Sequence, residues 1–470
     1  MADTQSSASS SDDRIRYPAG FRRRRGLNWF SLGLLYGAYY MCRYNFRFAT
    51  PGMMEEFSFT KSQIADMLAI WNLAYGTGQL INGLLCDRIG GKRSMLIGAI
   101  GTVIINLVFG FASFVGTFAT FSLIWLINGY MQAFGAPGMV KINAAWFQRR
   151  ERGTFAGIFG FMIQLGQVSI SKLAPMILAG ITFGTMVIAE PGEWRWLFRI
   201  PPLITAACAI FMWLAAKQTP EEAGYPGAVP DEIDNSAGVT VSLKDSFKTI
   251  FTHPLVWFYA AAYGCTGAVR QSSDQLAILY FEEALGFDMK VNIPVAAVLT
   301  LTAMPMMAVF GSFVSGWVSD RFFKGHRSPV AMTLYFFEAF VISCAAVILL
   351  LGLVGPTSRG IFLGCLILVL IALTANSTHS IVGAAAPMDI GGKKMAGFAA
   401  GVIDSFQYYG GAISLFITGR VLEATQETYG WTFWYVIMSG FGVLGGIAML
   451  LVMRKQKRLA AASAPAEQKA

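Results

Sequence analysis

Long hydrophobic runs alternate with short polar segments over almost the whole chain. A helix needs roughly 20 apolar residues to cross a bilayer, and about twelve runs reach that length. This pattern indicates an all-α polytopic membrane protein. We predict membrane-crossing helices near residues 27–50, 64–86, 94–114, 117–140, 154–178, 197–216, 254–281, 293–319, 328–352, 360–386, 396–420 and 431–453.

The two halves of the chain repeat each other. The segment Gly-Leu-Leu-Cys-Asp-Arg that begins at Gly83 is echoed by Gly-Trp-Val-Ser-Asp-Arg at Gly316, and each follows a long hydrophobic run. Arg43 and Arg270 match at an offset of 270 − 43 = 227 residues. Such a repeat is typical of carriers whose site lies between two lobes. We expect two pseudo-symmetric six-helix bundles, with an N-terminal tail at 1–26, bundles at 27–216 and 253–453, a linker at 217–252 and a C-terminal tail at 454–470.

The charge of the chain follows its membrane topology. Only 13% of the residues are charged, against about a quarter in a soluble chain. The net charge is +9, and the basic residues cluster in loops reached after an even number of crossings, whereas acids dominate the opposite loops. This positive-inside pattern predicts cytoplasmic termini and requires no nucleic-acid partner. We expect a multi-pass protein of the plasma membrane, which in a bacterium is the inner membrane.

Several classes of chemistry find no support in the sequence. The six cysteines show no spacing typical of disulfides or zinc sites. A Gly-x-x-x-x-Gly-Lys-[Ser/Thr] stretch and a folded soluble domain are both missing, so we expect neither an ATP-driven pump nor an enzyme, and no cofactor. The linker has room for a short amphipathic helix at 243–250. We expect residues 1–13 and the tail after Leu459 to be unstructured.

Two arginines interrupt hydrophobic runs in equivalent helices. Arg43 lies inside the first run and Arg270 inside the seventh, so pseudo-symmetry brings both guanidiniums to the central axis. An ionised side chain in the bilayer is costly and marks a functional site by default, and a guanidinium matches a phosphate or carboxylate bidentately. With tyrosines nearby, the pair predicts a dianion site. The alternative is structural pairing, since Asp274 lies one turn after Arg270, and Asp274 is also a candidate switch that releases Arg270 when the anion binds.

Other polar residues in or beside the runs carry weaker signals. His379 faces either the cavity or the packed interior, and Asp404 pairs with a base from either half. Lys172 either touches substrate or snorkels, and Lys141 is expected to anchor loops. The charged clusters at the ends of other runs suit interhelical salt bridges and helix capping without substrate contact, and they comprise Asp87, Arg88, Arg93, Asp320, Arg321 and Arg327.

With these residues in view, the chain resembles the major facilitator superfamily in its two Gly-x-x-x-Asp-Arg loops and its six-plus-six layout. More narrowly it resembles the organophosphate:phosphate antiporter family, which includes bacterial glycerol-3-phosphate and hexose-phosphate carriers. The matching motifs are Tyr39-Tyr40-x-x-Arg43-x-Asn45-Phe, Ala74-Tyr75-Gly76, Gly135-x-Pro137-x-x-x-Lys141, Pro220-Glu-Glu-x-Gly224, Arg270 and Lys393-Lys394-x-Ala-Gly397. The resemblance implies that both arginines grip a phosphoryl group and that the lobes rock to give alternating access. It also implies a cavity lined by Tyr36, Tyr40, Tyr75 and Tyr408.

Three positions depart from the family pattern. Gln79 stands where the family usually has a lysine, and Ile163 stands where the better-known carriers have a histidine. Asp274 comes one place before the position at which the pattern puts an acid. The phosphate grip is thus retained in altered surroundings, which leaves the identity of the substrate open. Further residues expected at the binding site are Gln79, Gln164, Asp274 and His379.

Three functions fit these observations. The first is a secondary antiporter that exchanges an organophosphate, such as glycerol 3-phosphate, a sugar phosphate or a phosphoglycerate, for inorganic phosphate. The second is a membrane receptor for an organophosphate, and the third is a carrier of another organic anion. We expect a monomer whose partners are the small anion and the lipid bilayer. Proton coupling stays open, with Asp274 and His379 as its titratable candidates.

Overall fold

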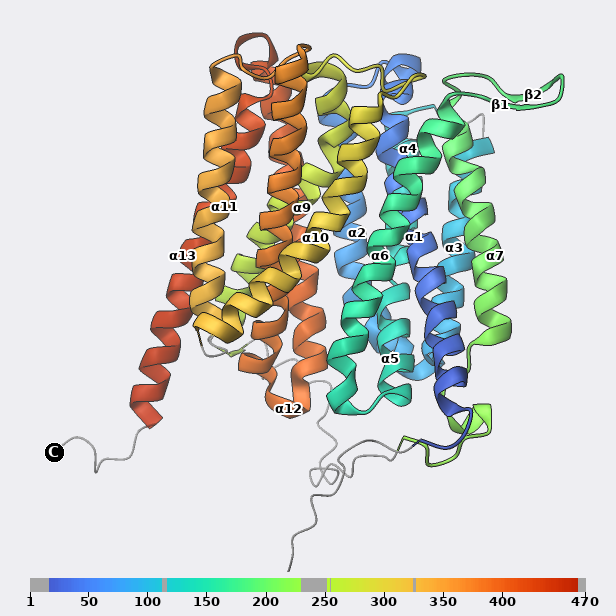
Figure 1. The fold of residues 1–470 in the computed structure, drawn as a ribbon, viewed down its shortest axis with the longest axis vertical. Coiled ribbons are helices and arrows are strands. Elements are labelled where there is room, and N and C mark those ends of the chain that lie inside the picture. The colour runs from blue at the N-terminus through green and yellow to red at the C-terminus, as the bar shows by residue number, and fades with distance from the viewer. Residues whose placement is uncertain (1–16, 112–115, 230–251, 254, 324–326, 464–470) are drawn as a thin grey trace, which may run out of the picture.

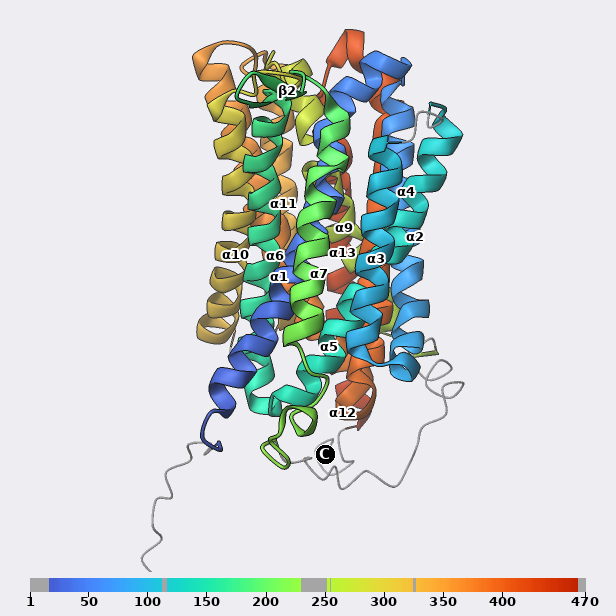
Figure 2. The same ribbon diagram turned by 90° about the vertical axis from the view of Figure 1, so that its right-hand side faces the viewer.

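The computed structural model describes residues 17–111, 116–229, 252–253, 255–323 and 327–463, with backbone alone at 149–150, 152–157, 159, 320, 384–400 and 459–463. Within this part, twelve α-helices run along the long axis of the molecule in both views (Figures 1 and 2). The first half forms α1 (Phe21–Phe57), α2 (Lys61–Ile89), α3 (Gly91–Phe111), α4 (Phe118–Gln132), α5 (Gly135–Trp146), α6 (Arg149–Leu178) and α7 (Ile200–Ala215). The second half forms α9 (Val256–Ala284), α10 (Val295–Phe322), α11 (Arg327–Leu350), α12 (Ser358–Tyr429) and α13 (Thr432–Ser463).

Two ends of the bundle are used as landmarks below. The hairpin end carries the antiparallel strands β1 (Ile181–Phe183) and β2 (Met186–Ala189), followed by the 3₁₀ helix η1 (Trp194–Phe198). The termini end carries the start of α1, the end of α13 and the short 3₁₀ helix η2 (Glu221–Ala223).

The predicted crossing at 117–140 is two helices rather than one. Helix α4 ends at Gln132, and α5 begins at Gly135 and continues to Trp146, beyond the predicted end. Pro137 lies in the first turn of α5 and has no backbone N–H, so it cannot donate to the carbonyl of Ala133. The break follows from that missing donor.

Helix α12 combines the predicted crossings 360–386 and 396–420. Its helical backbone is continuous, yet both of its ends lie at the hairpin end beside the end of α9. Gly364 lies against Tyr280, and Gln426 donates a hydrogen bond to Glu283 at 3.3 Å. The chain therefore folds back at 384–400, as Figure 1 shows at the termini end. We call 358–383 the first limb and 401–429 the second limb.

The chain termini and the linker differ in how far they are described. Helix α13 continues to Ser463, so the tail is helical for four residues after Leu459, where no structure was expected. The expected linker helix at 243–250 and the expected unstructured residues 1–13 lie outside the described residues.

Seven stretches in the described residues are long and apolar enough to cross a membrane by themselves. They belong to α3, α6, η1 with α7, α10, α11, the first limb of α12 and α13. Helices α1, α2 and α9 are long enough but not hydrophobic enough to be among these seven. They carry buried polar side chains such as Arg43, Asn72 and Arg270. The less apolar helices are therefore the ones that face the interior between the lobes.

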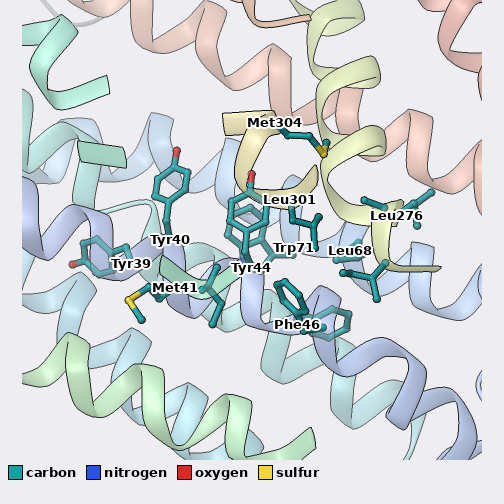
Figure 3. Close-up of a cluster of buried hydrophobic side chains, with 14 of the residues drawn as sticks. Tyr39, Tyr40, Met41, Tyr44, Phe46, Leu68, Trp71, Leu276, Leu301 and Met304 are labelled. Carbon is teal, nitrogen blue, oxygen red and sulfur yellow. The ribbon is translucent and has the colours of Figure 1, made fainter. Parts of the chain in front are cut away.

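The two lobes are closed against each other at the hairpin end. Figure 3 shows Tyr44 and Trp71 from the first half close to Leu301 from the second, within one buried apolar cluster. Three ion pairs also join the lobes there: Lys61 with Glu283 at 2.8 Å, Asp66 with Arg420 at 2.7 Å, and Glu55 with Lys290 at 2.9 Å. We call these three pairs the hairpin-end latch.

Candidate functional site

Arg43 is buried in α1 and is held by neutral groups. The residue as a whole is only 3% exposed. Its Nε donates to Oε1 of Gln132 at 3.1 Å, and its guanidinium lies over the rings of Tyr40 and Tyr75 at 4.4 Å and over that of Trp71 at 4.7 Å. Its Nη2 is buried and has no hydrogen-bond partner. A donor on a charged group is therefore left free to bind something else.

Arg270 occupies the matching position in α9. It is 9% exposed and its Nη1 donates to Oε1 of Gln407 at 3.4 Å. Tyr40 and Asp404 each lie within electrostatic range of both Arg43 and Arg270. The two guanidiniums, one from each lobe, thus have a tyrosine and an acid as common neighbours, although neither arginine is in the wall of the cavity described below.

Four tyrosines meet beside Arg43. The hydroxyls of Tyr36 and Tyr75 are 3.3 Å apart, and the ring of Tyr36 packs against that of Tyr40. The rings of Tyr75 and Tyr408, which come from opposite lobes, have centroids 4.4 Å apart. All four tyrosines predicted to line the cavity therefore belong to one cluster around Arg43, but none of them is among the described residues that line the cavity between the lobes.

A cavity of about 650 Å³ lies between the lobes at the termini end. Gln79 and Asp404 are in its wall, from α2 and the second limb of α12, and their side chains lie against each other. Tyr263 of α9 also lines it, and Asp87 and Lys141 stand toward the exposed end. Both lobes therefore contribute polar groups to one cavity.

Asp274 does not neutralise Arg270 by an ion pair, although both side chains are described. Its carboxylate accepts from the hydroxyl of Tyr44 at 3.2 Å, and its backbone carbonyl accepts from Nη1 of Arg47 at 2.8 Å. Tyr44 and Arg47 are on α1, so Asp274 bridges the lobes on the hairpin side of the arginines. The alternative reading, a fixed Arg270–Asp274 pair, is not seen.

His379, on the first limb of α12, is packed against α9 and the second limb. Its Nδ1 is 2.8 Å from the hydroxyl of Tyr263, and the two rings stack. The side chain lies against Gln407 and within electrostatic range of Arg270. His379 therefore supports groups that line the site from behind.

Neither Gln164 nor Lys172 contacts the arginines, the tyrosine cluster, Asp274 or His379 in the described residues. Oε1 of Gln164 is buried without a hydrogen-bond partner, and Lys172 is exposed on α6. The α6 residue that lies against Asp274 is Gln167, one turn after Gln164.

The charged clusters at the termini end are only partly described. Asp87 pairs with Lys141 at 3.1 Å, and Lys141 also donates to the backbone carbonyls of Cys86 and Asp87. Arg88 and Arg93 are exposed and form no ion pair with a described residue. Arg321 is exposed, and the side chain of Asp320 lies outside the described part.

Sequence reasoning missed two buried charged residues. Arg47 is 1% exposed and links three helices, since it also donates to Ser171 of α6 at 3.2 Å. Glu338, in the middle of the run that forms α11, is 0% exposed. The burial cost that singled out Arg43 and Arg270 applies equally to both of them. In the described residues no group of three His, Cys, Asp or Glu side chains is placed to hold a metal ion.

Comparison with known proteins agrees with this architecture. The model of the Major Facilitator Superfamily matches residues 32–415. The membrane sensor protein UhpC of Escherichia coli (strain K12) is 25% identical over 94% of both chains, and the glycerol-3-phosphate transporter of Bacillus subtilis (strain 168) is 26% identical over 95% of this chain and 96% of that one. A bacterial homologue of the human lysosomal transporter Spinster, solved inward-facing and unoccupied, has a TM-score of 0.69 at 15% identity and covers 92% of this chain and 97% of its own.

These matches confirm the family and fold predicted from the sequence. The chain is an all-α, multi-pass membrane protein with the helices of the major facilitator fold. It belongs to the Major Facilitator Superfamily.

Proposed function

We propose that this protein is a secondary carrier that exchanges an organophosphate for inorganic phosphate by alternating access. The observation that carries this proposal is the pair of buried guanidiniums, Arg43 and Arg270, one from each lobe and neither in an ion pair with a described acid. Two permanent charges that no acid contacts in an ion pair favour a dianion between them. Relatives named as glycerol-3-phosphate and hexose phosphate transporters support the same class of substrate.

The surroundings of the arginines suit a phosphoryl group. A guanidinium donates two parallel hydrogen bonds to oxygens of one anion, and the free Nη2 of Arg43 is available for this. Tyrosine hydroxyls can donate to the remaining phosphoryl oxygens. Gln79 replaces the cation expected from the family pattern, and Asp404 adds a negative charge beside it. The site therefore favours a substrate with a compact anionic head and a neutral polar remainder.

The shape of the molecule supports alternating access. The hairpin-end latch and the contacts of Tyr44 and Arg47 with Asp274 close one side of the arginines. On the other side lies the cavity that reaches Asp87 and Lys141. The basic loops favour a cytoplasmic termini end under the positive-inside rule, and in that orientation the described state faces inward.

The test is phosphate exchange in liposomes that contain the purified protein. Liposomes are loaded with unlabelled phosphate, and uptake of labelled phosphate is competed with glycerol 3-phosphate, hexose phosphates and phosphoglycerates. Arg43→Lys and Arg270→Lys each replace a fork with a point charge, at a loss of about 1.5–3 kcal/mol, or roughly 10- to 150-fold in affinity. Arg359→Lys, an exposed position at the hairpin end, is the matched control.

Each result separates the candidate functions. Exchange that one ester inhibits and that both variants lose supports the antiporter and names its substrate. Near-normal exchange in either variant defeats the two-arginine site. Binding of an ester without any exchange favours a receptor, the function that the name of the UhpC relative suggests for that protein.

A further inference from the structure

A lateral groove lies between α3 and α7, outside the candidate anion site. Its volume is about 410 Å³, and the side chains that line it are all hydrophobic. The two helices lie side by side (Figure 2) and pack mainly against other helices of the first half, so the groove faces away from the second lobe. Ile100, Ile104 and Ile210 border the groove and are more than half exposed. Because both helices are apolar enough to cross a membrane, this open side faces lipid.

Three basic residues stand where the groove reaches the termini end. On α3, Lys92 lies one turn before Leu96, the first residue that lines the groove. On α7, Trp213 is the last such residue, and Lys217 follows shortly after the end of that helix. The ammonium of Lys92 lies 4.7 Å over the ring of Trp213 and is within electrostatic range of Lys217 and Arg24. We call Arg24, Lys92 and Lys217 the basic cap of the groove.

The basic cap carries more charge than its surroundings compensate. Among the described residues none of its three members forms an ion pair. One acid, Glu222, is within electrostatic range of Lys92, but it is exposed and accepts a hydrogen bond from the backbone N–H of Gln218 at 2.9 Å. Neighbouring like charges repel each other, and an anion placed among them removes that cost. The cap therefore favours a negatively charged ligand.

Arg24 also has a hydrogen-bond donor to spare. Its Nη2 donates to the backbone carbonyl of Ala215, the last residue of α7, at 2.7 Å, and its guanidinium lies 5.7 Å from the ring centroid of Trp146. Its Nη1 is buried and has no hydrogen-bond partner. Leaving a donor on a charged group unsatisfied is costly, so an oxygen anion at the cap gains a strong hydrogen bond there.

The groove and its basic cap match the two parts of an anionic phospholipid. Between Leu96 and Ile104 a helix rises about 12 Å, and one leaflet of a bilayer has a hydrocarbon layer about 15 Å thick. The groove therefore has room for most of an acyl chain within one leaflet. A phosphodiester at its end offers oxygen acceptors to the cap, whereas a zwitterionic headgroup brings an ammonium of its own into positive surroundings. Basic pockets between membrane helices bind anionic headgroups for this reason.

We propose that the groove between α3 and α7 binds one anionic phospholipid, with an acyl chain along Ile100 and Ile104 and its phosphodiester at the basic cap. The site is separate from the one between the lobes and does not depend on the proposed exchange function. Its headgroup contacts join the start of α1, the start of α3 and the end of α7. The lipid thus holds together three helices of the first lobe at the termini end.

The test uses photoactivatable lipids in phosphatidylcholine vesicles that contain the purified protein. A trace of phosphatidylglycerol or of phosphatidylcholine is added, each carrying the same diazirine-labelled acyl chain, and mass spectrometry locates the labelled peptides after illumination. The phosphatidylglycerol probe should label peptides from 96–104 and 206–213 at least about fivefold more than the phosphatidylcholine probe, the factor expected for one charge near a membrane surface.

Two kinds of variant separate the headgroup contacts from the groove. Lys92→Gln/Lys217→Gln changes two partly exposed side chains and should lower phosphatidylglycerol labelling to the phosphatidylcholine level. Ala206→Phe fills the groove and should lower labelling by both probes. Lys457→Gln, an exposed base at the termini end of α13, is the control for charge. Ala207→Phe, exposed beside the groove but not lining it, is the control for bulk, and both controls should label as wild type.

Three results overturn the lipid site. Equal labelling by the two probes in wild type indicates an unselective lipid annulus. An equal loss of labelling in Lys457→Gln and in the double glutamine variant indicates general attraction of anionic lipid to a basic face. A groove that neither probe labels is covered by something other than lipid, and cross-linking between two copies of the chain then identifies a dimer contact.

Discussion

Arg43 and Arg270 are stabilised without losing their charge to a fixed acid. Gln132 and aromatic faces hold Arg43, and Gln407 holds Arg270. Cation–π contacts and amide oxygens compensate part of the desolvation of a guanidinium while leaving its net charge in place. The candidate site therefore keeps two positive charges for the anion proposed above, and Asp404 is an acid within electrostatic range of both.

Asp404→Asn should tighten anion binding. The substitution keeps the shape and removes a negative charge within electrostatic range of both arginines. At an effective dielectric constant near 20 we expect a gain of about 1 kcal/mol, or roughly fivefold in affinity for phosphate. Equilibrium binding of labelled phosphate to the purified protein measures it, with Glu190→Gln at the exposed hairpin end as control. Weaker binding would show that Asp404 contacts the substrate favourably.

At the scale of elements, the two arginine helices are positioned by the same kind of crossing. In the first half α1 meets α6 where a Cβ on Gly166 would overlap the carbonyl of Gly37. In the second half α9 meets the second limb of α12 where a Cβ on Gly410 would overlap the carbonyl of Gly264. Gly37 and Gly264 each precede their arginine by six residues and match at the same offset, 264 − 37 = 227. Small residues allow this close backbone approach in a membrane.

Gly410→Ala should destabilise the protein and weaken anion binding together. The added methyl group pushes α9 and the second limb apart, and overpacking of this kind costs about 1–3 kcal/mol. Thermal unfolding in detergent and phosphate binding measure the two effects. Gly440→Ala is the control, since no atom lies within 4 Å of its Cβ position, and it should be neutral or stabilising. An unchanged unfolding temperature for Gly410→Ala would contradict this crossing.

At the scale of the whole molecule, the lobes are joined at the hairpin end and separated by the cavity at the termini end. The hairpin-end latch consists of partly exposed pairs, and in the Asp66–Arg420 pair the arginine side chain is 58% exposed. Such pairs contribute little to stability, because water and salt screen them. The latch can therefore be broken in the alternating-access cycle proposed above.

Exchanging the charges of one latch pair tests whether the latch holds the hairpin end closed. Asp66→Arg or Arg420→Asp alone places like charges together and should favour opening of the hairpin end, whereas the double variant restores an attractive pair. We expect each single variant to raise labelling of a cysteine placed beneath the latch several-fold, and the double variant to return it close to wild type. Equal labelling in all four proteins would falsify a role for this pair in closure.

The sequence by itself determined the class of the protein and indicated the centre of the candidate site. Hydrophobic length predicts a crossing helix whatever its neighbours are, and a charged residue in such a helix is costly wherever it points. Both signals are local, so the repeat, the family and the two arginines were all visible in one chain. Glu338 was visible by the same rule and was overlooked.

Only the tertiary structure decided which side chains meet. Successive residues of a helix point about 100° apart, so the sequence did not show that Gln167 rather than Gln164 lies against Asp274. Two further partners of Asp274, Tyr44 and Arg47, are on α1, and Tyr44 is 230 residues away in sequence. The latch pair Lys61–Glu283 likewise spans both lobes. Such contacts depend on how the lobes dock in one state of the cycle. Docking is a property of surfaces assembled from many segments, and no single segment encodes it.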